Sequence, residues 1–216
     1  NKHPPSLDIL GLNTYGDSSY LPEAVQVYGW EKPYVVAEWG PYGWWEVGKT
    51  EWGASVEETS SEKAQTYQKS VDAILSDKKN CLGSYVFLWG QKQEHTSTWF
   101  GLFTEAGEET EVMDVLINSW SGKEPTNYAP TISEFKLNND GPKDDITVIP
   151  AAKMETSVLI QDKDIDEIEY EWQIRPESDD KKTGGDAERV PKPLKGVFGK
   201  STHSSNKVSF NAPLKE

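Results

Sequence analysis

A single carboxylate ends an apolar run of the sequence. The run Tyr34-Val35-Val36-Ala37-Glu38 is rich in β-forming residues, and Trp39-Gly40-Pro41 must end it. Such a run is typical of a parallel strand that is buried on both faces. α/β enzymes keep catalytic groups at the carboxyl ends of these strands, because the rigid sheet holds the side chain beside the substrate cleft. Glu38 is therefore the first candidate for chemistry.

Glycosidic bond cleavage is one reaction that suits such a carboxylate. Cleavage with retention needs two carboxyl groups about 5 to 5.5 Å apart, one to attack the anomeric carbon and one to protonate the leaving oxygen. A phenol hydrogen-bonded to the attacking carboxylate would keep it ionised and aimed, and an indole face would accept a sugar ring. The alternative for Glu38 is a carboxylate paired with a neighbouring base at a strand end.

Three strand candidates alternate with helical patterns, which favours an α/β fold with a parallel sheet. The strands are Leu7 to Asn13, Tyr34 to Glu38 and Gly83 to Trp89. A first helix is expected from Pro22 to the stop at Gly29. Thr59 and Glu62 have the spacing of a capping box and predict a second helix over residues 60 to 77. A third helix is predicted from Val112 to Trp120, with its stop at Gly122.

The sequence changes character at Pro125. Residues 125–131 are interpreted as a linker between a first domain, 1–124, and a second domain, 132–216. Short strands with polar turns predict a small, truncated all-β sandwich of the immunoglobulin-like kind. The predicted strands are Ile132 to Leu137, Ile146 to Ile149, Ser157 to Ile160, Ile168 to Ile174 and Lys207 to Phe210. A long mobile loop is predicted over residues 177–206.

Charge and composition exclude some partners. The formal net charge is -14, which disfavours nucleic acid and anionic membrane surfaces. No run of residues is apolar and long enough to predict a membrane span. Cys81 is the only cysteine, so neither an intrachain disulfide nor a thiolate metal cluster is expected. No cofactor is predicted, and an exposed aromatic surface would fit a carbohydrate partner.

Three segments together carry a family resemblance. They are Asp8 to Tyr15, Lys32 to Gly40 and Tyr85 to Trp89. In order and spacing they resemble the last three strands of the (β/α)8 barrel in retaining glycoside hydrolases of the clan that contains families 2 and 5. The resemblance covers roughly residues 7 to 125 and implies a partial TIM barrel. It implies that Glu38 is the nucleophile, that Tyr15 contacts it and that Trp89 forms the floor of the sugar site.

The same resemblance implies that part of the enzyme lies outside the sequence. In the family the acid/base glutamate ends the fourth strand, and nothing here precedes the sixth. The chain is therefore expected to be a C-terminal fragment, inactive alone, of a secreted, periplasmic or cell-surface bacterial enzyme acting on a β-linked glycan. An incomplete barrel exposes strand edges, so association with the rest of the barrel or with a second copy is expected.

Other candidate ligand contacts lie in loops around Glu38. The loop Pro41 to Val56 carries Trp44, Trp45 and Trp52, and Trp99 follows the third strand. These indoles are read either as sugar-stacking platforms or as rings that pack the loop onto the barrel rim. Asn13, Trp39 and Glu94 complete the predicted substrate-binding set, while Glu46 and Glu51 are alternative loop carboxylates.

The second domain contains an acidic run, Asp162-Lys163-Asp164-Ile165-Asp166. It resembles the calcium-binding turn of cadherin-like sandwich modules, but Ile165 replaces the glycine of that turn. A plain acidic turn is the alternative. Two functions thus stay open: a retaining glycosidase with Glu38 as its nucleophile, and a carbohydrate-binding or structural module without turnover.

Overall fold

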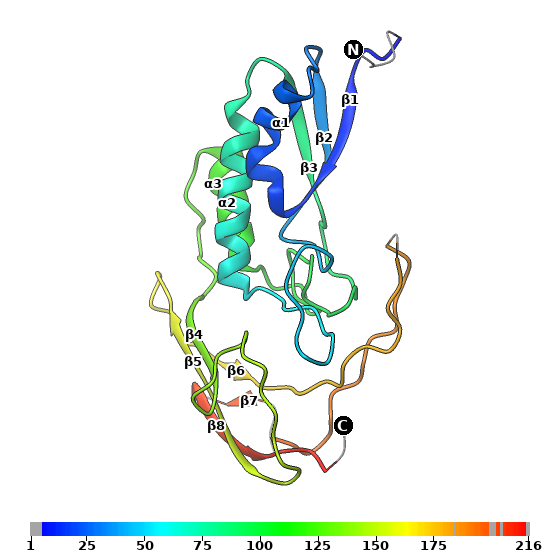
Figure 1. Ribbon diagram of the computed structural model, residues 1–216. Coiled ribbons are helices and arrows are strands. Elements are labelled where there is room, and N and C mark those ends of the chain that lie inside the picture. The colour runs from blue at the N-terminus through cyan, green and yellow to red at the C-terminus, as the bar shows by residue number, and fades with distance from the viewer. Residues whose placement is uncertain (1–5, 184, 199–201, 204, 215–216) are drawn as a thin grey trace.

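The computed structural model describes residues 6–183, 185–198, 202–203 and 205–214, of which 202 and 203 are described by their backbone alone. The chain first forms a parallel sheet with helices and then two antiparallel sheets (Figure 1). Within these ranges no helix has the length and apolarity needed to cross a bilayer.

The parallel sheet has the strand order β1-β2-β3, and both of its strand pairs are parallel as predicted. The strands are β1 (Leu10–Thr14), β2 (Tyr34–Trp39) and β3 (Cys81–Val86). β1 begins and ends later than predicted, and β3 ends before Trp89. The register between β1 and β2 shifts once, because Leu12 lies opposite Val36 while Asn13 lies opposite Glu38. Such a bulge breaks the alternation of side chains along the strand.

The predicted helices all form, with small changes at their ends. A short 3-10 helix, η1 (Gly16–Tyr20), leads into α1 (Leu21–Val27). α2 (Ser60–Ser76) has the predicted capping box, in which Thr59 and Glu62 each bind the other's backbone N–H. α3 (Glu111–Ser121) ends at Gly122, which has the left-handed conformation of a C-terminal cap.

The helices cover one face of the parallel sheet (Figure 1). Tyr34, Val36 and Trp39 on β2 are fully buried in a core that also contains Tyr67 of α2 and Leu116 of α3. Aromatic and β-branched side chains on a central strand bury a large apolar area, which stabilises this unit by the hydrophobic effect. The third helix is also expected to pack on the sheet through Val112, Leu116 and Trp120; Val112 and Leu116 are buried, but for Trp120 this is wrong, since its side chain is 47% exposed.

The other face of the sheet carries no helix among the described residues (Figure 1). Ala37 lies on the central strand and is nevertheless exposed, as is Asn13 on β1. Within the described ranges β1 and β3 each pair on one side only, so the sheet is open and closes no barrel. Apolar side chains at its margins also stay exposed; they are Ile9, Leu82, Tyr85 and Trp89.

The second part of the chain is antiparallel, as predicted. β4 (Thr131–Leu137), β5 (Lys153–Gln161) and β8 (Lys207–Asn211) form one sheet in the order β4-β5-β8. β6 (Tyr170–Glu171) and β7 (Thr202–His203) form a second, two-stranded sheet. Met154, Phe210 and Ala212 form a small core between these segments.

Two strand predictions in this part are wrong. Residues 146 to 149 form no strand and pair with none of the strands of the sheet β4-β5-β8. Of the predicted strand from Ile168 to Ile174, only Tyr170 and Glu171 pair with a neighbour. Period-two alternation predicts which face a strand buries, but a strand also needs a partner for its backbone groups.

The predicted linker is irregular but is held against the helices. Asp114 of α3 accepts the backbone N–H of Ala129 at 3.0 Å, and Glu111 accepts the hydroxyl of Thr131 at 3.1 Å. Ser61 of α2 accepts the N–H of Ile132 at 2.7 Å. The two parts of the chain are therefore joined by hydrogen bonds as well as by the backbone.

Candidate functional site

Tyr15 and Glu38 meet at the carboxyl ends of β1 and β2. The Tyr15 hydroxyl donates a hydrogen bond of 2.9 Å to Glu38 Oε2. Burial, with added effects from the hydrogen bond and charge of Glu38, raises the pKa of the Tyr15 phenol well above its usual range. The phenol therefore stays protonated and remains a donor to the carboxylate. Glu38 is half-buried, so its carboxylate is held in place and still reaches the surface.

The local backbone brings this pair together. Parallel strands end at the same edge of the sheet, and the bulge sets Asn13 opposite Glu38. Gly40 follows β2 where the chain passes close to Tyr15. A Cβ atom at Gly40 would lie 3.0 Å from the carbonyl oxygen of Phe87 and 3.3 Å from the Tyr15 ring. A larger residue would therefore push the phenol away from Glu38.

Aromatic rings surround Tyr15. The ring centroids of Trp45, Phe100 and Phe87 lie 5.2, 5.5 and 5.9 Å from that of Tyr15, each in an edge-on arrangement. Phe100 is buried, whereas Trp45 is 50% exposed. Edge-on contacts of this kind are favourable beyond the area that they bury. The cluster therefore fixes the phenol and leaves one indole open to a flat ligand.

The loop that carries Trp45 is folded by Glu46. Its Oε2 accepts the backbone N–H groups of Gly43 and Gly16, at 2.6 and 3.0 Å. One carboxylate oxygen thus ties the loop after β2 to the start of η1. Glu46 therefore has a structural role in holding this loop. Trp52 in the same loop is 57% exposed.

A second group of side chains lies beside Trp45. Trp44 stacks on His95 with centroids 4.2 Å apart, and its Nε1 donates to Glu94 Oε1 at 3.3 Å. Lys92 forms an ion pair with the other oxygen of Glu94 at 2.8 Å. Glu94 is only 7% exposed. Glu94 is therefore held by contacts within the protein, and its predicted contact with a sugar stays a prediction.

Three further tryptophans named from the sequence differ in their exposure. Trp39 has no exposed surface and packs on Tyr67 in the core, so its side chain is not available to a ligand. Trp99 is also buried, and its Nε1 donates to the carbonyl of Tyr42 at 2.9 Å. Trp89 is 62% exposed and packs edge-on against Phe103. Among the described residues, no hydrogen bond or ring contact joins Trp89 to Tyr15 or Glu38.

The structure adds residues that sequence reasoning missed. Phe87 and Phe100 belong to the ring cluster around Tyr15, and His95 carries the stack with Trp44. The sequence pattern could have identified Phe87, because it lies two residues before Trp89 at the end of the predicted strand. Phe100 and His95 lie in a connection without periodicity, and only the packing of that loop brings them to the site.

A cavity of about 360 Å³ lies between the N-terminus of α2 and β4, but neither Tyr15 nor Glu38 lines it. Its buried cation, Lys63, is ion-paired with Glu57 and donates to the carbonyl of Thr98 at 2.6 Å. Those contacts already satisfy the charge of the Lys63 ammonium. The Tyr15–Glu38 pair is the better candidate site, because its carboxylate accepts from a phenol whose ring contacts the half-exposed indole of Trp45.

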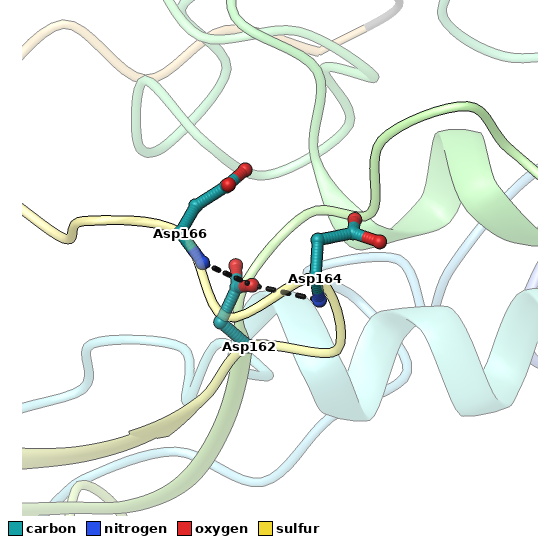
Figure 2. A group of neighbouring side chains, drawn as sticks. All are labelled: Asp162, Asp164 and Asp166. Carbon is teal, nitrogen blue, oxygen red and sulfur yellow. Dashed lines mark hydrogen bonds between the residues drawn. The ribbon is translucent and has the colours of Figure 1, made fainter.

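The acidic run of the second part forms a turn after β5 (Figure 2). One oxygen of Asp162 accepts the backbone N–H groups of Asp164 and Asp166, at 2.9 and 3.1 Å. Asp164 accepts the N–H of Tyr128 in the linker at 2.6 Å. These contacts give Asp162 and Asp164 structural roles in the turn and in the linker. A plain acidic turn accounts for these three hydrogen bonds.

Comparison with known proteins gives little. No protein-family model matches the chain, and no curated protein sequence matches it. Among solved structures, the chain resembles β-glucuronidase 2 of Bacteroides uniformis covalently bound to cyclophellitol-6-carboxylate aziridine, with a TM-score of 0.38 and 10% sequence identity. The match covers 97% of this chain, which spans 23% of that one. At this TM-score the likeness is too weak to define the fold.

Proposed function

We propose that the Tyr15–Glu38 pair is the nucleophile half of a retaining glycosidase site for a β-linked glycan. The observation that carries this proposal is the 2.9 Å hydrogen bond from the Tyr15 phenol to Glu38. A carboxylate that must attack carbon has to be ionised, aimed and partly desolvated. A phenol that stays protonated satisfies one oxygen of Glu38 and leaves the other to react.

The proposed reaction is a double displacement. Glu38 attacks the anomeric carbon, and the bond to the leaving oxygen breaks as the glycosyl ester forms. A second carboxyl group protonates the leaving oxygen, and then activates the water that cleaves the ester. The exposed indole of Trp45, beside Tyr15, would receive the apolar face of the sugar ring.

The open sheet supports the proposal of a larger barrel around this site. Parallel sheets occur almost only with both faces covered, whereas Ala37 on the central strand β2 is exposed here. We therefore propose that β1, β2 and β3 are the last three strands of a (β/α)8 barrel, completed by another polypeptide segment. The antiparallel part would be an accessory immunoglobulin-like module.

Carbohydrate binding without turnover is a second candidate function. It is favoured by the contacts of the other carboxylates near Tyr15. Glu94 is paired with Lys92 and Trp44, and Glu46 holds two backbone N–H groups. Neither is in a position to act as an acid without giving up these partners. The exposed Trp45 ring beside Tyr15 would still bind a sugar.

Covalent trapping tests the proposal on this chain. In a 2,4-dinitrophenyl 2-deoxy-2-fluoro-β-glycoside the leaving group departs without protonation, so trapping requires no acid/base residue. A panel with gluco, galacto, manno and xylo configurations would be incubated with the chain, and the adduct located by peptide mass spectrometry. We expect one glycosyl adduct, on Glu38, and none in Glu38→Gln. Glu23→Gln, which removes an exposed carboxylate of α1, is the matched control.

The two functions give different results in this experiment. Binding of β-linked tetrasaccharides without any adduct would support the binding module and overturn the nucleophile role of Glu38. An adduct on another carboxylate would also overturn it. The p-nitrophenolate leaving group gains more from protonation than 2,4-dinitrophenolate does. We therefore expect no turnover of p-nitrophenyl glycosides by this chain. Sustained hydrolysis would show that an acid/base is present within it.

A further inference from the structure

A loop of the antiparallel part contacts the loop that carries Glu94 and His95. We call it the Glu188 loop; it comprises residues 177–183 and 185–189. Glu188 Oε2 accepts the backbone N–H of His95 at 2.8 Å, and the carbonyl of Gly185 accepts from Lys92 Nζ at 2.8 Å. In Figure 1 this stretch, in orange, extends from the antiparallel sheets back toward the loops at the end of the parallel sheet.

The Glu188 loop is held together by its own hydrogen bonds. Lys182 donates its backbone N–H to Glu188 Oε1 at 2.9 Å, and its ammonium donates to the carbonyl of Ala187 at 2.6 Å. Arg189 donates its N–H to Asp180 at 2.7 Å. The two oxygens of Glu188 therefore have different partners, one within its loop and one on His95. This carboxylate joins the two loops.

The contact at His95 continues to the candidate site through stacked and edge-on rings. His95 stacks on Trp44 at 4.2 Å, Trp44 lies edge-on to Trp45 at 5.2 Å, and Trp45 lies edge-on to Tyr15 at 5.2 Å. His95 also has a φ of 61°, in the left-handed region that costs a non-glycine residue about 1 kcal/mol or more. The hydrogen bond from its N–H to Glu188 holds this backbone conformation in place.

We propose that Glu188 is a positioning residue for the candidate site, and that through it the antiparallel part sets the orientation of the Trp44 and Trp45 indoles. The identity of the ligand as a sugar rests on the proposed function. The accessory part is then a component of the site that determines which sugar ring fits beside Glu38. It is more than a tether at the end of the sheet.

A ligand-independent measurement tests the positioning role. A histidine ring stacked on an indole has ring protons shifted upfield, so the NMR signal of His95 reports the Trp44–His95 stack. The chain has three histidines, and His95→Gln would assign the signal. We expect Glu188→Ala to remove the upfield shift, and Glu188→Gln to keep it, because the amide oxygen can still accept the His95 N–H while the amide nitrogen replaces the oxygen that accepts from Lys182. Glu167→Ala, at an exposed position, is the control.

Two glycines provide a second, matched pair of variants. Gly185 and Gly196 have φ values of 79° and 76°, so alanine is strained at either position. A Cβ atom at Gly185 would lie 3.2 Å from Lys92 Nζ, whereas nothing lies within 4 Å at Gly196. We expect Gly185→Ala to move the His95 signal and Gly196→Ala to leave it unchanged. Equal effects of the two variants would mean that backbone strain, and not the contact with Lys92, is responsible.

The affinity for oligosaccharides tests the consequence for ligand selection. Cellotetraose, mannotetraose and xylotetraose would be titrated while the tryptophan fluorescence is followed. We expect Glu188→Ala to weaken binding of the preferred tetrasaccharide roughly tenfold, as the loss of one hydrogen bond to a charged group predicts, with Glu188→Gln near wild type. An unchanged His95 signal, or an unchanged affinity in Glu188→Ala, overturns the inference. If the wild type binds no tetrasaccharide and forms no adduct, the proposed function fails, while the NMR result still decides the positioning role.

Discussion

The hydroxyl of Tyr15 lies 2.9 Å from Glu38 Oε2 although 23 residues separate the two in sequence. The contact joins the ends of two neighbouring parallel strands, β1 and β2. Glu38 is thus held by a half-buried phenol, whose ring in turn contacts the exposed indole of Trp45.

Removal of the phenol hydroxyl is expected to impair Glu38 without unfolding the chain. In Tyr15→Phe the ring keeps its edge-on contacts with Trp45, Phe87 and Phe100. Glu38 loses a hydrogen bond to a charged group, worth about 1.5 to 3 kcal/mol, so adduct formation should slow roughly tenfold or more. The rate would be followed by intact-protein mass spectrometry. Tyr20→Phe, at a 66% exposed position, should not change it.

Displacement of Trp45 is expected to weaken sugar binding while Glu38 is intact. A Cβ atom at Gly43 would lie 2.5 Å from the Trp45 indole, so Gly43→Ala forces that ring to move. Gly48 is in the same loop, and a Cβ there would meet nothing within 4 Å. Tetrasaccharide titrations should show lower affinity for Gly43→Ala and wild-type affinity for Gly48→Ala. Unchanged binding in both would mean that Trp45 does not contact the ligand.

Asp114 is expected to make the stability depend on pH. Burial raises the pKa of Asp114 from 3.8 to about 6, and the neighbouring charge of Glu111 adds to this, while the N–H of Ala129 opposes it. The folded chain thus holds this proton more tightly than the unfolded chain. The resulting stabilisation is fully present below pH 3.8 and is lost as the pH rises through about 6.

Urea unfolding of Asp114→Asn should reveal this effect. The neutral amide can still accept the Ala129 N–H and avoids a buried charge, so we expect a gain of about 1 kcal/mol at pH 7. The difference from wild type should vanish or reverse near pH 4, where the wild-type carboxyl is protonated. Asp186→Asn, at an exposed position, serves as the control. If Asp114→Asn were less stable than wild type at pH 7, burial of the charged Asp114 carboxylate would not be destabilising.

Ile165 is expected to strain the acidic turn. It has a φ of 64° and is 90% exposed, so this β-branched residue has an unfavourable backbone conformation and little packing. Glycine would relieve about 1 to 2 kcal/mol of strain at an entropic cost of about 0.5 to 1 kcal/mol. We expect Ile165→Gly to raise the free energy of unfolding, measured in urea, and Ile165→Ala to raise it much less. Equal effects would trace the gain to the side chain and not to the backbone.

Local signals in the sequence predicted the elements of the first part well. The capping box of Thr59 and Glu62 and the stop at Gly122 depend on residues within one helical turn, so α2 and α3 could be predicted nearly to the residue. The apolar run from Tyr34 similarly predicted β2. In the second part, residues 146 to 149 had a strand-like pattern but found no partner, because pairing depends on chain segments far away in sequence.

The candidate site depended on contacts that no local pattern contains. The sequence by itself determined that Glu38 lies near the end of an apolar strand and that indoles follow it; the expected burial of both faces of that strand is wrong, since Ala37 is exposed. Only the tertiary structure decided which neighbours it has: the register shift between Leu12 and Asn13 lets Glu38 lie at the open face while Trp39 enters the core. A shift of one residue exchanges the two faces of a strand. The packing of loops likewise brought His95 and Glu188 to the site, since their contact joins residues 93 positions apart.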